Sequence, residues 1–129
     1  MDLSIHGSFE PYVYVAFWQL SLAGLQQIRL AQGFDQEKNR ILKFYASATF
    51  LVATAMNWMT WGLAIWIWLH YDAARALVFF LLSFVTSVVA LWALQSHREF
   101  LLPTHVFGVP GTPIFAYCTI VSLGLPISL

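Results

Sequence analysis

The sequence predicts an all-α membrane protein: a polytopic, antiparallel bundle of four transmembrane helices with both termini on the non-cytoplasmic side. Hydrophobic residues make up 60 % of the chain and charged residues only 9 %, whereas an ordinary soluble domain has about 25 % charged residues. Between Lys43 and His70 no Asp, Glu, Lys, Arg or His occurs. About 20 apolar residues are enough for a helix to cross a bilayer, and four such segments fit into residues 1–129 as one domain.

The spans that we expect cover residues 12–31, 41–70, 73–95 and 113–129. The first begins after Pro11 and ends before Gly33. Glycine is typical of the position just beyond a helix C-terminus. Asp35 is placed to cap the N-terminus of the second helix, which we predict from about Gln36 to His70. That helix would be longer than the bilayer is thick, so its first turns should stand outside the membrane.

The connections after the second and third spans differ in character. The short turn before residue 73 predicts a tight helical hairpin with Asp72 as the N-cap of the third helix. The segment 96–112 contains Pro103, Gly108 and Pro110 among apolar residues, so we interpret it as lying at the membrane surface or against a neighbouring protein. Thr112 and Pro113 then have the pattern of an N-cap and first helical residue that open the last span.

The distribution of positive charge predicts the orientation. One side of the membrane would carry five basic residues and the other only Arg75; the five are Arg29, Lys38, Arg40, Lys43 and Arg98. Because Lys and Arg favour the cytoplasmic side of short loops, both termini should lie on the other side. The expected location is a bacterial inner membrane or an organellar membrane.

The predicted spans hold amides and hydroxyls but no acids or bases in their interior, which disfavours proton-coupled transport. Small or polar residues recur at helical spacing and predict faces that pack against other helices: Thr49, Ala53 and Asn57, and Ser83 and Ser87. Asn57, near the middle of the membrane, should bond to another helix here or in a second protein. The alternative role for Asn57 is as a ligand for a pigment, quinone or substrate.

Among the histidines, only His97 and His105 could share a haem or metal ion, because His70 would lie at the opposite membrane surface. Glu99 is near them in sequence, but their spacing matches no established ligand pattern, and interfacial histidines are usually solvated. The single cysteine, Cys118, allows no internal disulfide and no thiolate metal cluster. No metal site and no cofactor is firmly implied.

The function that we expect is that of a non-catalytic subunit of a larger membrane complex, one that converts energy or transfers electrons. Its partners would be other integral membrane subunits and lipids, with Phe100 and Phe107 of the interrupted segment contacting them. The zero net charge and the absence of long basic runs argue against a nucleic-acid partner. Two alternatives remain open. One is a small homo-oligomeric channel or carrier with a path lined by Asn57, Thr54 and the glutamines of the first helix; the other is a membrane anchor that binds haem, metal or quinone.

Overall fold

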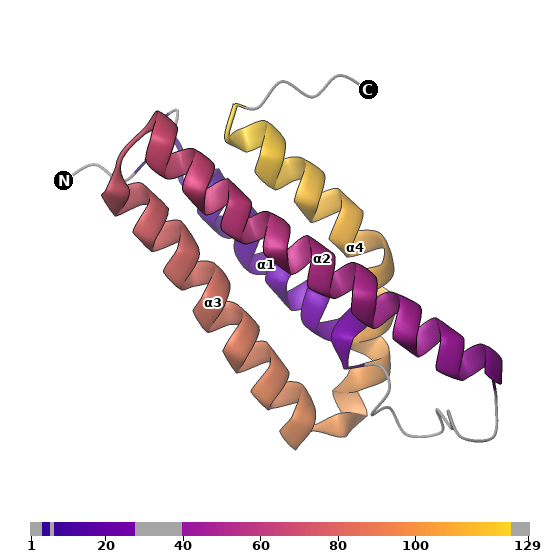
Figure 1. The fold of residues 1–129 in the computed structure, drawn as a ribbon. Helices are drawn as coiled ribbons and strands as arrows, with labels where there is room; N and C mark the ends of the chain where they lie inside the picture. The colour runs from indigo at the N-terminus through magenta and orange to yellow at the C-terminus, as the bar shows by residue number, and fades with distance from the viewer. Residues whose placement is uncertain (1–3, 6, 28–39, 125–129) are drawn as a thin grey trace.

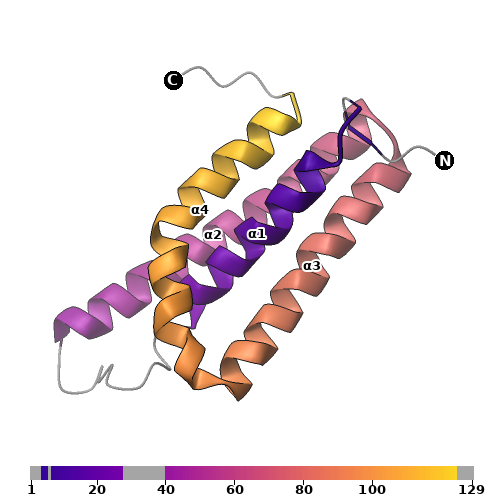
Figure 2. The ribbon, with the colours of Figure 1, turned by 180° about the vertical axis from the view of Figure 1, so that it is seen from behind.

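The computed structural model describes residues 4, 5, 7–27 and 40–124, which form an all-α four-helix bundle (Figure 1). The elements are α1 (Glu10–Gln26), α2 (Arg40–His70), α3 (Ala73–Ser96), the short 3-10 helix η2 (Arg98–Phe100) and α4 (Leu101–Ser122). Successive α-helices run in opposite directions, so the start of α1 and the end of α4 lie at the same end of the bundle as the α2–α3 turn (Figures 1 and 2). We call this the hairpin end and the other the η2 end.

The shortest α-helix, α1, is the centre of the bundle. It packs against α2, α3 and α4, with α4 as its most extensive neighbour. It begins at Glu10, and Pro11 occupies its first turn, where a missing N–H costs no helical hydrogen bond. Val15, Trp18 and Leu22 are at most 1 % exposed and form much of the hydrophobic core. The predicted helix end before Gly33 lies outside the described residues.

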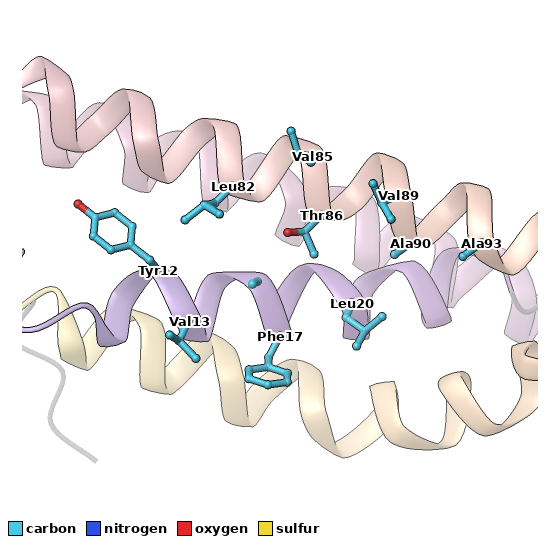
Figure 3. Close-up of a pocket in the computed structure, with 11 residues that line it drawn as sticks. Tyr12, Val13, Phe17, Leu20, Leu82, Val85, Thr86, Val89, Ala90 and Ala93 are labelled. Carbon is cyan, nitrogen blue, oxygen red and sulfur yellow. The ribbon is translucent and has the colours of Figure 1, made fainter. Parts of the chain in front are cut away.

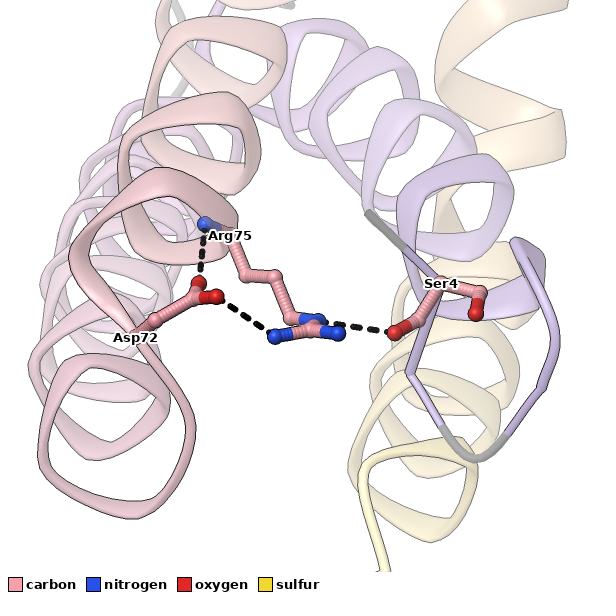
Figure 4. Close-up of polar contacts among 3 residues, drawn as sticks. All are labelled: Ser4, Asp72 and Arg75. Carbon is pink, nitrogen blue, oxygen red and sulfur yellow. Dashed lines mark hydrogen bonds and ion pairs between the residues drawn. The ribbon is translucent and has the colours of Figure 1, made fainter. Parts of the chain in front are cut away.

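The predicted hairpin between α2 and α3 is confirmed, including its cap. The carboxylate of Asp72 accepts a hydrogen bond from the backbone N–H of Arg75 (2.8 Å), which satisfies one of the free donors at the start of α3. The Arg75 guanidinium in turn pairs with the same carboxylate (2.6 Å) and donates from Nε to the carbonyl oxygen of Ser4 (2.8 Å; Figure 4). These contacts hold the N-terminal segment, whose Ile5 side chain is fully buried, against the hairpin end.

The prediction for the start of the last helix is wrong. We expected it to open at Thr112 and Pro113, but α4 begins at Leu101 and continues through Pro110 and Pro113. Each proline lacks one N–H, so α4 loses individual hydrogen bonds without ending, and the helix changes direction between its two halves (Figures 1 and 2).

Glycines in α4 allow its backbone to approach α1 closely. A Cβ atom built on Gly108 would lie 2.6 Å from the carbonyl oxygen of Ser21, and one on Gly111 would lie 2.8 Å from the Ser21 hydroxyl. On the facing helix, a Cβ on Gly24 would lie 2.6 Å from the carbonyl oxygen of Thr104. Gly108, which we expected in a segment at the membrane surface or against a neighbouring protein, therefore serves helix packing within the bundle.

Two helices of the described chain are long and apolar enough to cross a membrane: Lys43–His70 within α2 and Ala73–Ser96, which is α3. Only 28 % and 22 % of the residues in their most apolar windows are buried in the bundle. Their hydrophobic side chains thus face outward for the most part. The predicted cap Asp35, the start of the second helix at Gln36 and the basic residues Arg29 and Lys38 lie outside the described residues.

Candidate functional site

A buried glutamine joins three helices near the middle of the bundle. The Nε2 amide of Gln19 in α1 donates to the hydroxyl oxygens of Thr60 in α2 (3.2 Å) and Ser83 in α3 (3.3 Å). All three side chains are 1 % exposed. The Thr60 hydroxyl donates onward to the carbonyl oxygen of Asn57 (2.6 Å). We call Gln19, Thr60 and Ser83 the polar clamp; its hydrogen bonds are enclosed within the bundle.

The residues predicted to pack against other helices fall into three groups. Ala53 and Ser83 are buried in the interior, whereas Thr49, Asn57 and Ser87 are half-buried. The remaining pair, Phe100 and Phe107, is exposed. We expected Asn57 to be the polar link between helices, but the interhelical bonds at this level come from Gln19. The amide side chain of Gln19 in an apolar helix is the sequence signal that could have identified this link.

The two histidines considered as a ligand pair have different surroundings. The His97 side chain is 58 % exposed, and its Nδ1 atom lies 3.9 Å from the Glu99 carboxylate. His105 is 5 % exposed, with Nε2 2.5 Å from the hydroxyl of Tyr45 and Nδ1 3.4 Å from the carbonyl oxygen of Gly24. Both ring nitrogens of His105 therefore already have protein partners.

The environment of His105 also affects its protonation. Because the ring is 5 % exposed, burial disfavours its charged, protonated form. Within the described ranges, no three His, Cys, Asp or Glu residues are grouped so that they could hold a metal ion. The arrangement around His105 is thus suited to linking helices α1, α2 and α4.

An apolar groove of about 720 Å³ runs between α1 and α3. Its α3 side includes the small residues Thr86, Ala90 and Ala93 (Figure 3). From α1, Ala16 also lines the groove. The larger side chains that line it are Tyr12, Val13, Phe17, Leu20, Leu82, Val85 and Val89. Small residues at helical spacing allow a further helix to approach closely in a membrane. We call this feature the α1–α3 groove.

The outer surface between α2 and α3 is aromatic as well as apolar. Trp58 and Trp61 pack at 4.9 Å between ring centroids, and Trp61 lies 6.1 Å from Phe80 across the helix pair. A smaller hollow of about 340 Å³ lies beside them, next to Trp68. Trp58 and Trp68 are 64 % and 61 % exposed, so this surface presents large rings outward.

Comparison of the chain with protein-family models, with curated proteins and with solved structures gives no match.

Proposed function

We propose that the protein is an integral membrane subunit without catalytic activity that binds other membrane subunits and lipids within a larger complex. In this proposal all four helices lie in a bacterial inner membrane or an organellar membrane, with α2 and α3 facing hydrocarbon or neighbouring subunits. Energy conversion or electron transfer is the class of complex that we expect.

The observation that carries the proposal is the imbalance between buried and exposed apolar residues. Among the described residues, 31 large hydrophobic side chains are exposed, whereas 17 hydrophobic residues are buried. A soluble monomer rarely exposes contiguous apolar surface beyond a few hundred Å². Because α2 and α3 are mostly unburied and neither opens the chain, a buried core helix or a signal sequence does not explain their hydropathy. Hydrocarbon or apolar protein is the environment that such surfaces require.

The position of charged residues supports the same environment. In the described chain they occur near helix ends: Glu10, Asp72 and Arg75 at the hairpin end, and Arg40, Lys43, Arg98 and Glu99 at the η2 end. The polar clamp between these levels is buried and internally bonded. This arrangement favours a structural role over conduction along a polar path through one copy of the chain.

The α1–α3 groove is the surface that we propose for a partner helix. An α-helix with side chains is about 10–12 Å wide, and small residues at the contact reduce the distance between two helix axes. Thr86, Ala90 and Ala93 provide such a contact along α3, flanked by Val85 and Val89. In a membrane, close van der Waals packing of this kind is a principal source of helix association.

The test is isolation of the full chain from its native membranes in mild detergent, followed by native mass spectrometry of what remains bound. Val89→Trp would fill the α1–α3 groove, whereas Val88→Trp places the same ring on α3 outside the groove; the native side chains are 56 % and 50 % exposed. We expect a membrane-protein partner with the wild type and with Val88→Trp, and a loss of at least tenfold in recovered partner with Val89→Trp. A chain that is recovered from the soluble fraction, or alone in every detergent, would contradict the proposal.

A further inference from the structure

His105 holds the beginning of α4 to two other helices. A carbonyl oxygen can only accept a hydrogen bond, so the contact of Nδ1 with Gly24 assigns the ring proton to Nδ1. The Nε2 atom then accepts the hydrogen bond from the Tyr45 hydroxyl. This pattern is that of a neutral imidazole, and it bridges α1 and α2 from a position one turn after α4 begins.

The part of α4 that carries His105 is connected to the rest of the helix through a proline-containing bend. Pro110 and Pro113 lack the N–H groups that would bond to the carbonyls of Val106 and Val109. The change of helix direction is visible in Figures 1 and 2. We call residues 101–109 the arm, and the bend at Pro110 and Pro113 the hinge.

We propose that His105, Tyr45 and the Gly24 carbonyl form a pH-sensitive latch, in which protonation of His105 loosens the arm from α1 and α2 about the hinge. This inference goes beyond the proposed subunit role and does not depend on it. Protonation of Nε2 removes the acceptor of the Tyr45 hydroxyl and places a positive charge on a side chain that is 5 % exposed.

The direction of the pH effect follows from linkage. When the arm is closed, the Nε2 atom accepts the hydrogen bond from the Tyr45 hydroxyl and the ring is buried, so both contacts disfavour protonation of Nε2. When the arm is open, Nε2 is released from Tyr45 and can bind a proton. Protons therefore bind the open form better, and opening becomes easier as the pH falls.

Among the residues that the structure describes, the charged groups at the η2 end provide no paired anion for His105. The described part of α1 from Gln19 to Gln27 has no ionisable side chain, and α3 has none from Ala76 to Ser96. The Glu99 carboxylate is exposed and lies beside His97. The remaining ionisable groups that the structure describes near this end, apart from Tyr45, are cationic: Arg40, Lys43 and Arg98.

Hydrogen exchange measured on the full chain in nanodiscs tests the latch between pH 7.5 and 5.0. Amide protection in residues 101–109, corrected for the intrinsic exchange rate, should fall at least threefold in the wild type as the pH decreases. His105→Asn keeps a donor for Gly24 but cannot titrate, so its protection should not depend on pH. His97→Asn removes an exposed histidine at the same end and should behave like the wild type.

Unchanged protection in the wild type, or the same pH response in His105→Asn, would overturn the proposal. Because that variant could fold poorly, ¹⁵N-histidine NMR of the wild type gives a second, independent test. We expect His105 to be the Nδ1–H tautomer at pH 7.5 and to become protonated over the pH range in which the protection of residues 101–109 falls. A Nε2–H tautomer, or protonation of His105 without loss of protection in residues 101–109, would also refute the latch.

Discussion

Removal of the polar clamp donor by Gln19→Leu tests whether interior hydrogen bonds stabilise this bundle. Leucine approximates the size of glutamine and leaves the apolar packing of α1 in place, so the change isolates the two bonds to Thr60 and Ser83. Interhelical hydrogen bonds in membranes contribute on average about 0.6 kcal/mol and at most about 1.7 kcal/mol each. Both hydroxyls accept their hydrogen bonds from Gln19, so the variant takes no acceptor away from either of them. The Thr60 hydroxyl still donates to the Asn57 carbonyl oxygen. We therefore expect a loss of about 1–2 kcal/mol in the free energy of unfolding.

The assay is reversible unfolding in mixed detergent micelles, monitored by circular dichroism. A double-mutant cycle with Ser83→Ala should give a coupling energy of about 0.5–1 kcal/mol, because each single variant breaks the same bond. Ser87→Ala is the matched control, since Ser87 lies one turn away on α3 and is half-buried; we expect a change of less than about 0.5 kcal/mol. Full additivity of Gln19→Leu and Ser83→Ala would refute the reasoning.

Three further predictions concern the helix contacts, the hairpin and the orientation. Gly108→Ala should reduce stability by about 1–3 kcal/mol in the same unfolding assay, because its Cβ would lie 2.6 Å from the Ser21 carbonyl oxygen; Gly62→Ala, where nothing lies within 4 Å, should be neutral or stabilising by up to about 1 kcal/mol. Equal effects of the two glycine variants would contradict the close α1–α4 approach. Asp72→Ala should cost about 1 kcal/mol through loss of the N-cap, and Glu99→Ala, at an exposed position, should change thermal stability much less. With Cys118 replaced by Ser, a cysteine at Gly7 should react with an impermeant reagent from outside and one at Ser96 only from the cytoplasmic side; the reverse pattern would disprove the predicted orientation.

The helical hairpin could be predicted from sequence because its signals are local. Asp72 stands directly before an apolar run, and its side chain needs only the backbone of the following turn to act as a cap. The all-α bundle likewise follows from long apolar segments separated by short polar connections. Such features depend on neighbouring residues, so the sequence alone contains enough information to predict them.

The course of α4 and the surroundings of His105 could not be predicted in this way. The sequence pattern marks Pro110 as a break and Pro113 as the first residue of a new helix, but α4 continues through both, and Gly108 provides its close contact with α1. The position of His105 between Tyr45 and Gly24 depends on that continuity, because a surface segment would have left the imidazole in water. The polar clamp similarly requires knowledge of which faces of three helices meet.

The central position of α1 has a consequence for biogenesis. The ribosome synthesises this helix before any of the three that enclose it, so its buried residues, including Trp18 and Gln19, must wait for contacts that arise later in translation. The α2–α3 pair needs only a tight turn to form and supplies one side of the enclosure, and α4 completes the other. A nascent chain halted before α4 emerges would thus leave the Ser21 and Gly24 face of α1 uncovered, so the fold is completed only once α4 has been synthesised.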